Sequence, residues 1–167
     1  MPLIDVARAN PFVDGRQSQR AMEVRAGVER HYREQGWATL PEVTLSGGRR
    51  ADLLALSPKG DVTIVEIKSS VADLRADAKW PDYRAHCDEL VFATLRDVPA
   101  DIFPEDAGLM VADAYGAHRL RPGPVHRLSA HGRKKIHLRF ARAAALRLAR
   151  CCEHAGVDAT DFRDEAA

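Results

Sequence analysis

The sequence predicts an α/β domain in which helices flank a mixed central sheet and an extra basic helix follows at the C-terminus. Helical periodicity over residues 16–35 and 133–152 predicts the outer helices. Two apolar runs joined by a tight turn within residues 49–69 predict a hairpin. Short apolar strands at 90–95 and 108–112 extend the sheet.

Local signals place the elements in order. The first helix ends near Gly36, and residues 37–45 form a strand near a sheet edge because Pro41 interrupts it. Proline and glycine at positions 121–124 end regular structure before the last helix. The other elements are strands 49–56 and 61–69, helices 71–79 and 81–89, strand 90–95, loop 96–107, strand 108–112 and helix 133–152.

Composition bounds the class of protein. The 167 residues are 46% hydrophobic and 29% charged, which fits one domain with a single core. We expect an arm over residues 1–15, the domain over 16–152 and an acidic tail over 153–167. The sequence has no long apolar run and no secretory leader, and its three cysteines are too few for a disulfide framework. These features predict a cytoplasmic protein that does not enter membranes.

Charge is distributed unevenly along the chain. Residues 114–150 contain ten Lys and Arg and no Asp or Glu, so the rest of the chain carries −9 to give the overall +1. This asymmetry predicts a surface for a polyanion beside an acidic region, although solvated arginines can also cluster without a ligand.

The turn at residues 57–61 sets the register of the hairpin. Pro58 and Gly60 suit a three-residue loop with a left-handed glycine. Side chains that face each other then share one side of the sheet, because successive residues of a strand alternate between its two sides. The facing pairs are Leu56 with Val62, Leu54 with Ile64, Asp52 with Glu66, and Arg50 with Lys68.

The facing carboxylates of Asp52 and Glu66 suggest a metal site. Like charges about 5 Å apart destabilise a sheet, and a divalent cation such as Mg²⁺ or Mn²⁺ relieves the repulsion. The Ile67 carbonyl is a further candidate ligand. Lys68 lies about 6.6 Å beyond Glu66 on the same side, within reach of a bound water or a phosphate. The alternative is a cross-strand ion cluster completed by Arg50.

Asp52, followed after thirteen residues by Glu66-Ile67-Lys68, resembles the PD-(D/E)XK nuclease signature, with Ala51 in place of the leading proline. Over roughly residues 16–150 the chain is similar to the MmcB family of bacterial DNA-repair proteins, a branch of that superfamily. The segments that carry the similarity are residues 49–56, 65–70, 77–84, 87–88 and 108–116. The resemblance implies a restriction-endonuclease-like αβββαβ core and metal-dependent cleavage of DNA in repair.

The resemblance also implies further site residues. Related nucleases often place a metal-binding glutamate on the first helix, where Glu23 and Glu29 are the candidates. The second core helix often adds a catalytic residue, and Lys79 and Tyr83 are the candidates there. Each of these side chains has a purely structural alternative.

The last helix is the expected DNA-binding element. At about 100° per residue, four of its cations fall within roughly an 80° arc, and Arg147 lies at the edge of this arc. The four are Lys135, Arg139, Arg142 and Arg150. Such a surface binds phosphates without reading base sequence, so we expect selectivity for DNA structure. The predicted DNA contacts are Arg50, Lys135, Arg139, Arg142, Arg147 and Arg150.

The sequence therefore predicts a Mg²⁺- or Mn²⁺-dependent DNA nuclease. Asp52 and Glu66 are the expected ligands, and Lys68 is the catalytic base or charge stabiliser. A DNA-binding repair scaffold that does not cut is the main alternative, and a metal-free interaction domain is a third. Homodimerisation stays open.

Overall fold

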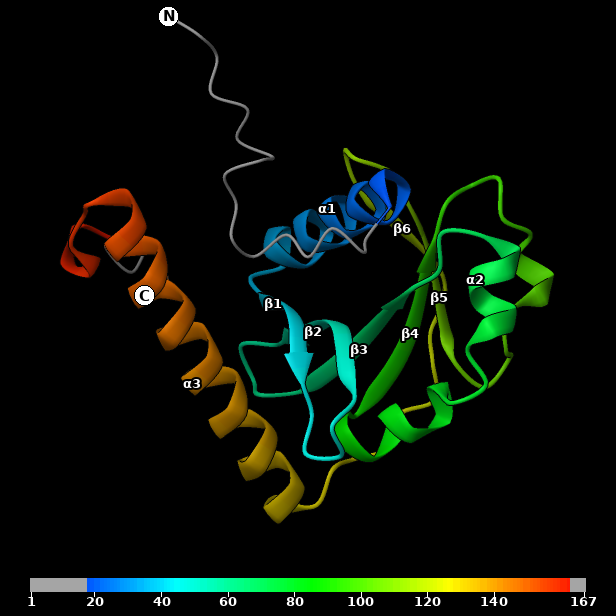
Figure 1. Ribbon diagram of the computed structural model, residues 1–167. Helices are drawn as coiled ribbons and strands as arrows, with labels where there is room; N and C mark the ends of the chain where they lie inside the picture. Colours follow the sequence, from blue (N-terminus) through cyan, green and yellow to red (C-terminus); the bar gives the residue numbers. More distant parts are fainter. Residues whose placement is uncertain (1–17, 163–167) are drawn as a thin grey trace, which may run out of the picture.

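A six-stranded mixed sheet forms the centre of the protein, and the computed structural model describes residues 18–162 (Figure 1). The strands lie in the order β1 to β6. Neighbouring strands are antiparallel except for β3–β4 and β4–β5, which are parallel. The strands are β1 Ala38–Thr44, β2 Arg50–Leu56, β3 Val62–Ile67, β4 Glu89–Thr94, β5 Gly108–Ala112 and β6 Ala117–Arg121.

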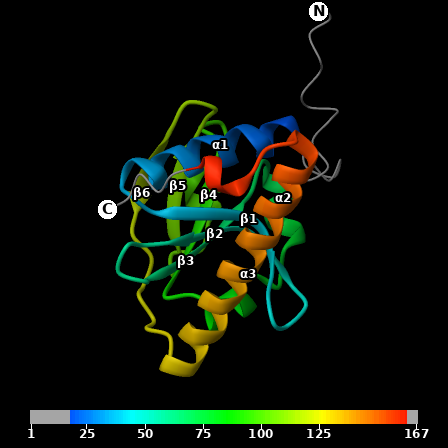
Figure 2. The ribbon, with the colours of Figure 1, turned by 90° about the vertical axis from the view of Figure 1, so that its left-hand side faces the viewer.

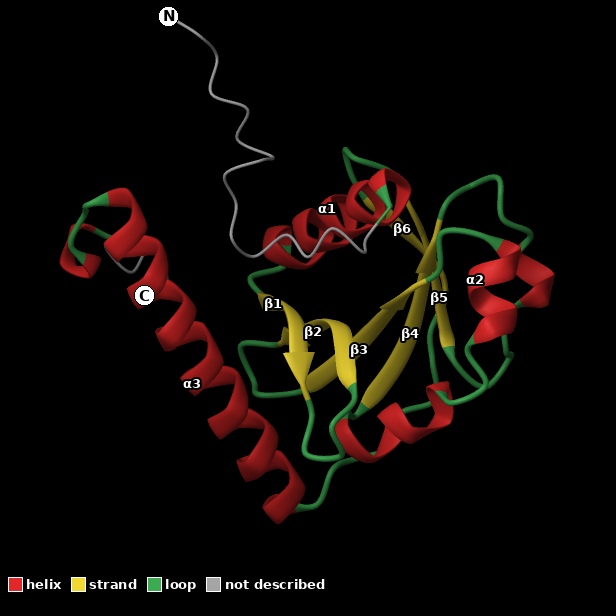
Figure 3. Ribbon diagram, in the orientation of Figure 1, coloured by secondary structure: helices red, strands yellow, loops and turns green. Residues whose placement is uncertain are grey.

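Within residues 18–162, three α-helices and three short 3₁₀ helices surround this sheet (Figure 3). The α-helices are α1 Gln19–Glu34, α2 Val71–Ala76 and α3 Ala130–Ala155. The 3₁₀ helices are η1 Trp80–His86, η2 Ala100–Ile102 and η3 Ala159–Asp161. Each α-helix begins at a serine whose hydroxyl accepts a backbone N–H of the first turn, namely Ser18, Ser70 and Ser129.

Helices cover the two sides of the sheet through separate apolar clusters. The buried side chains of α1, such as Val28, pack on the side that carries Leu53 and Val65. The other side carries Leu54, on which η1 and α3 pack. In Figure 2, α3 runs diagonally across β1 and β2. Glu66 lies between Val65 and Ile67 of the α1 cluster and therefore points to the side of η1 and α3. The charges of Asp52 and Glu66 both act on Tyr83 of η1, so Asp52 lies on this side as well.

The predicted hairpin is confirmed at its turn and its first pairs. Leu56 pairs with Val62 and Leu54 with Ile64. At the turn, Gly60 adopts the expected left-handed φ of 86°. The expectation that Arg50 faces Lys68 is wrong, because the ladder stops before those positions. Arg50 lies 3.2 Å from a Glu42 carboxylate oxygen instead.

Several element boundaries differ from the predictions. Strand β6 was not expected. In this edge strand the half-buried Arg119 and Arg121 alternate with the exposed His118 and Leu120. The helix expected over 81–89 is the 3₁₀ helix η1, and Glu89 already belongs to β4. Helix α3 continues to Ala155, into the expected tail. The expected arm 1–15 and residues 163–167 lie outside the described residues.

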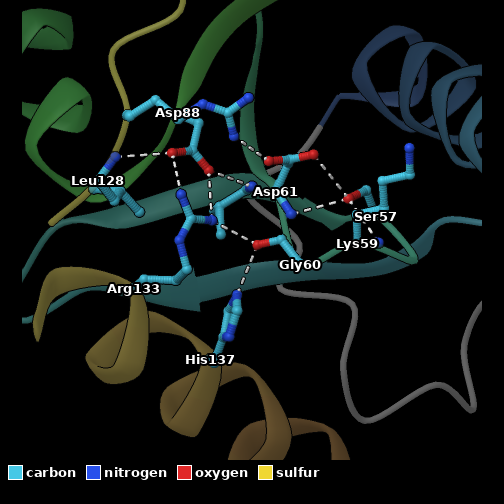
Figure 4. A network of polar contacts seen from close by, with 10 residues as sticks. Ser57, Lys59, Gly60, Asp61, Asp88, Leu128, Arg133 and His137 are labelled. Atoms are coloured by element: carbon cyan, nitrogen blue, oxygen red, sulfur yellow. Dashed lines mark hydrogen bonds and ion pairs between the residues drawn. The ribbon is translucent and has the colours of Figure 1, made fainter. Parts of the chain in front are cut away.

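A buried ion pair fastens the start of α3 to the sheet (Figure 4). Asp88 lies just before β4, and both of its carboxylate oxygens accept hydrogen bonds from Arg133, at 2.7 and 2.9 Å. The same carboxylate accepts the backbone N–H groups of Val62 and Leu128. Asp88 thus connects β3, β4 and the segment before α3.

No helix in the described part of the chain is both long enough and apolar enough to cross a membrane.

Candidate active site

Asp52 and Glu66 meet where β2 and β3 separate. The backbone ladder between the strands ends at Leu53 and Val65. Beyond it, the Asp52 N–H donates to Glu66 Oε1 at 3.2 Å, and the Ile67 N–H donates to Asp52 Oδ2 at 2.8 Å. Each carboxylate therefore satisfies a backbone donor that the ladder no longer pairs.

Lys68 lies directly beyond this fork, with a side chain only 7% exposed. Its Nζ is 2.7 Å from Asp77 Oδ2 and 3.9 Å from Glu66 Oε2. Its backbone is also anchored, because its N–H donates to the Ala93 carbonyl and its carbonyl accepts the Thr94 hydroxyl. The ammonium is therefore held in a defined position among carboxylates.

Burial is the dominant electrostatic influence on the two acids. It raises the pKa of Glu66, and the neighbouring Asp52 charge raises it further. Burial also raises the pKa of Asp52, although the Ile67 N–H and Lys68 oppose the shift. Close carboxylates away from water disfavour the doubly charged state, which is the condition that a bound cation would relieve.

Lys68 responds in the opposite way. Burial disfavours its charged form, but the hydrogen bond to Asp77 and the charge of Glu66 outweigh burial. The pKa of Lys68 is therefore raised above its ordinary value, and the side chain keeps its proton at neutral pH.

Tyr83 from η1 closes the site from the side of the helices. Its buried hydroxyl donates to the Arg50 carbonyl at 3.1 Å. Burial, followed by the charges of Glu66 and Asp52, raises the pKa of Tyr83 well above its usual range. The structure thus places this predicted residue beside the acids, although its hydroxyl proton is engaged with the backbone.

Asp77 joins the site, although the sequence analysis gave it no catalytic or metal-binding role. It follows α2 directly, and its side chain turns inward to Lys68 while Oδ1 accepts the Lys79 N–H at 3.2 Å. The Lys79 side chain is exposed, so only its backbone joins the cluster. Asp77 begins the segment 77–84 that carries part of the family resemblance, which is the signal in the sequence that points to it.

Asp73 is a second acid near the site to which the sequence analysis gave no role. Its Oδ2 accepts the Ser69 N–H at 3.0 Å, and its charge contributes to the raised pKa of Asp52. Ser70 caps α2, since its hydroxyl accepts the Asp73 N–H.

The glutamates of the first helix do not join the cluster. Glu23 accepts a hydrogen bond from Gln19, and Glu29 lies 3.9 Å from Arg25. Helix α1 packs on the side of the sheet opposite to Asp52 and Glu66, so Glu23 and Glu29 do not face this carboxylate pair. The metal-binding role expected for one of them has no geometric support.

Within residues 18–162, no group of three or more His, Cys, Asp or Glu side chains is arranged to hold a metal ion. The donor set at the fork is a carboxylate pair with the Ile67 backbone beside it. This set still fits a hard divalent cation, because Mg²⁺ commonly takes one or two protein carboxylates and completes its shell with water and substrate phosphate.

The predicted DNA-binding residues of α3 are exposed except for Arg147, which is half-buried. Lys135, Arg142 and Arg150 are exposed along α3. Arg139, also exposed, donates to the Thr44 carbonyl at 2.7 Å. Arg147 is half-buried and donates to the carbonyls of Pro41 and Glu42, and burial lowers its pKa. Arg147 therefore anchors α3 to β1, a role that the helical arc alone did not reveal.

Three of these cations also line a groove of about 640 Å³ between α3, η1 and the β1–β2 turn. Lys135, Arg139 and Arg142 lie on its α3 wall. His86 from η1 and Ser46 from the turn form the opposite wall. Because η1 also carries Tyr83, the basic groove begins on an element that borders the acids.

Comparison with known families agrees with this architecture. A family model for DNA repair protein MmcB-like matches residues 8–155. The chain belongs to this family. The assignment gives the MmcB-like protein a place in DNA repair, and with it an interaction with DNA.

A solved structure shares the MmcB-like fold. The SPO1766 protein of unknown function from Silicibacter pomeroyi is 36% identical, with a TM-score of 0.80. The match covers 86% of this chain and 98% of that one. No curated protein matches the chain.

Proposed function

We propose that this MmcB-like protein is a metal-dependent DNA nuclease of the PD-(D/E)XK type that hydrolyses phosphodiester bonds during DNA repair. The observation that carries the proposal is the meeting of the half-buried Asp52 carboxylate and the buried Glu66 carboxylate beside the buried ammonium of Lys68. A sheet gains nothing in stability from such an arrangement, whereas phosphoryl chemistry needs these groups together.

Asp52 and Glu66 would hold Mg²⁺ or Mn²⁺, with the Ile67 carbonyl as a further ligand. When bound, the ion supplies a water of lowered pKa and positive charge beside the phosphate. The chain's own contribution is a rigid support for this donor pair. The hydrogen bonds from the Asp52 and Ile67 N–H groups fix both carboxylates before any ligand arrives.

Lys68 stabilises charge in this proposal and does not act as the base. Its raised pKa favours a permanent ammonium, which can face the extra negative charge of the transition state. Asp77 holds Nζ in place, and Tyr83 supports the adjacent strand through the Arg50 carbonyl. Asp77 and Tyr83 are therefore positioning residues, and Lys79 has no assigned part.

The exposed cations of α3 would hold the DNA through its phosphates. Lys135, Arg142 and Arg150 supply this surface, and Arg139 adds to it at the groove. Arg50, beside the acids, would extend it toward the scissile bond. Contacts of this kind weaken steeply with salt and do not read bases, which supports selection by DNA structure.

The direct test is cleavage of plasmid, single-stranded and branched DNA with Mg²⁺, Mn²⁺ or EDTA. We expect cutting with either ion, none with EDTA, and none for Lys68→Ala, which should still bind DNA. Asp82→Asn is the matched control, because among the described residues the exposed Asp82 carboxylate pairs only with Arg49. Cutting by Lys68→Ala at the wild-type rate would contradict the proposal.

Metal binding can be measured without catalysis. Electron paramagnetic resonance of Mn²⁺ should show binding to the wild type and weaker binding to Asp52→Asn. Equal binding to both proteins would remove Asp52 from the ligand set.

A second candidate is a DNA-binding repair scaffold that does not cut. The observation in its favour is the 2.7 Å contact that engages Lys68 with Asp77. DNA binding that persists while every substrate and metal condition fails to give cleavage would favour this candidate.

A further inference from the structure

The turn between β5 and β6 carries Tyr115, which at 83% is the most exposed large hydrophobic residue among those described. The turn beneath it is well ordered by hydrogen bonds. Asp113 Oδ1 accepts the N–H groups of Tyr115 and Gly116 at 2.8 and 3.1 Å, and the Asp113 N–H donates to the Gly116 carbonyl. An Asx turn of this kind restricts the backbone that presents the ring.

Helix α1 holds the same turn from below. A Cβ atom added at Gly27 would lie 2.0 Å from the Asp113 carbonyl oxygen and 2.4 Å from that of Gly116. Only glycine permits so close an approach of helix and turn. The backbone that carries Tyr115 is thus held by hydrogen bonds and by contact with α1, while the ring itself is exposed to solvent.

Tyr115 borders a hollow of about 580 Å³ that also includes Leu95, Arg96, Val111 and His118. The two acids of its lining are already engaged. Asp97 pairs with Arg20 at 2.7 Å, and Asp113 accepts the Tyr115 N–H within the turn. The side chains of Arg96 and His118 are exposed and have no hydrogen bond or ion pair with any residue of the described range 18–162. The hollow therefore offers an aromatic face, an apolar wall and unengaged donors.

The strand order places this hollow at the same end of the parallel strands as Lys68, namely the carboxyl end. Strands β3, β4 and β5 are parallel, so their carboxyl ends lie side by side at the same end of the sheet. The Lys68 N–H donates to the Ala93 carbonyl, and the neighbouring Thr94 pairs with Val111, which faces His118 on β6. Two strand spacings, about 10 Å, separate the ends of β3 and β5.

We propose that this hollow binds unpaired nucleotides of DNA, with a base stacked on Tyr115 and phosphates held by Arg96 and His118. A base in a duplex hides its faces between its neighbours, whereas a single strand exposes them to an aromatic ring. This inference rests on the proposed function, and it defines the substrate as DNA with a single-stranded segment close to the scissile phosphate.

Fluorescence anisotropy in EDTA tests the inference without cleavage. Labelled single-stranded and blunt duplex oligonucleotides are titrated with the wild type, Tyr115→Ala and Tyr115→Phe. Tyr115→Ala should weaken single-strand binding by roughly tenfold and leave duplex binding unchanged, while Tyr115→Phe should bind like the wild type. Phe162→Ala is the matched control, because Phe162 is another exposed aromatic, at 61%, and lies outside the hollow.

Photocrosslinking locates the contact. Single strands that contain 5-iodouracil should attach to the peptide that carries Tyr115, as read by mass spectrometry. Failure of the wild type to bind single strands, equal loss on both DNA forms, or unchanged binding by Tyr115→Ala would overturn the inference. Because these measurements need no cutting, an inactive wild type would contradict the nuclease proposal and leave this result standing.

Discussion

The Lys68 ammonium is 1.2 Å closer to Asp77 than to Glu66, with Nζ–O distances of 2.7 and 3.9 Å. The acid that directly follows α2, and not the acid of the Glu66-Ile67-Lys68 motif, is therefore the primary partner of the lysine. The first prediction follows from this preference.

Asp77→Asn should lower kcat for DNA cleavage by roughly tenfold to a hundredfold, because the ammonium loses the partner that positions it. KM and single-strand affinity should stay unchanged, since Asp77 lines neither the α3 groove nor the hollow beside Tyr115. Asp77→Glu should recover part of the rate. A fall in thermal stability with no change in kcat would instead assign Asp77 a structural role.

Glu66→Gln should stabilise the metal-free protein by about 1 kcal/mol at pH above the ordinary glutamate pKa, because a neutral amide cannot acquire the charge that burial and Asp52 disfavour. The folded-state pKa of Glu66 is raised, so the stabilisation from its bound proton is present at low pH and is lost as pH rises through that pKa. The gain from the substitution should therefore grow toward alkaline pH. Urea denaturation across pH measures it, with the exposed Glu34→Gln as control.

Asp88→Asn should destabilise the fold by roughly 3 kcal/mol, because it leaves Arg133 without its buried partner. Burial opposes the charge of Asp88, but Arg133 and two backbone N–H groups outweigh it and lower the pKa. The stability from a lowered carboxyl pKa is present above about pH 4 and is lost as pH falls through the folded value. Thermal melts of the two proteins should converge in acid.

A suitable control for this network is Arg127→Ala, since the Arg127–Asp61 pair is largely exposed. Its removal should cost less than about 1 kcal/mol. If the two substitutions cost the same, the Asp88 pair does not fasten α3.

Lys135→Glu combined with Arg142→Glu should weaken DNA binding strongly at low salt. The slope of log Kd against log salt concentration should fall by about two, one for each lost phosphate contact. Arg30→Glu, on the exposed side of α1, is the matched charge control. An unchanged slope would separate α3 from the DNA surface.

The sequence predicted what short-range rules determine. Alternation and turn chemistry placed Asp52 and Glu66 side by side, because a loop of defined length sets the register of a hairpin. The apolar strands at 90–95 and 108–112 were equally readable, since burial on both sides demands continuous apolar residues. The family resemblance agreed with the later family assignment and with the mixed sheet.

Contacts between distant segments escaped sequence reasoning. The inward turn of Asp77 depends on how α2 ends, and the anchoring role of Arg147 depends on where α3 crosses β1. Neither relationship has a local pattern. The edge strand β6 was missed because half-exposed polar strands differ little in composition from loops.

The position of Arg147 has a consequence for self-association. The edges of the sheet are β1 and β6, and Glu42 adopts a positive φ of 51° in β1, where it interrupts the pairing. The Arg147 guanidinium donates hydrogen bonds to the carbonyls of Pro41 and Glu42 at that irregularity. These two acceptors are therefore not available to pair with a strand of another chain. Any second copy that lengthened this sheet would have to add its strand beside β6.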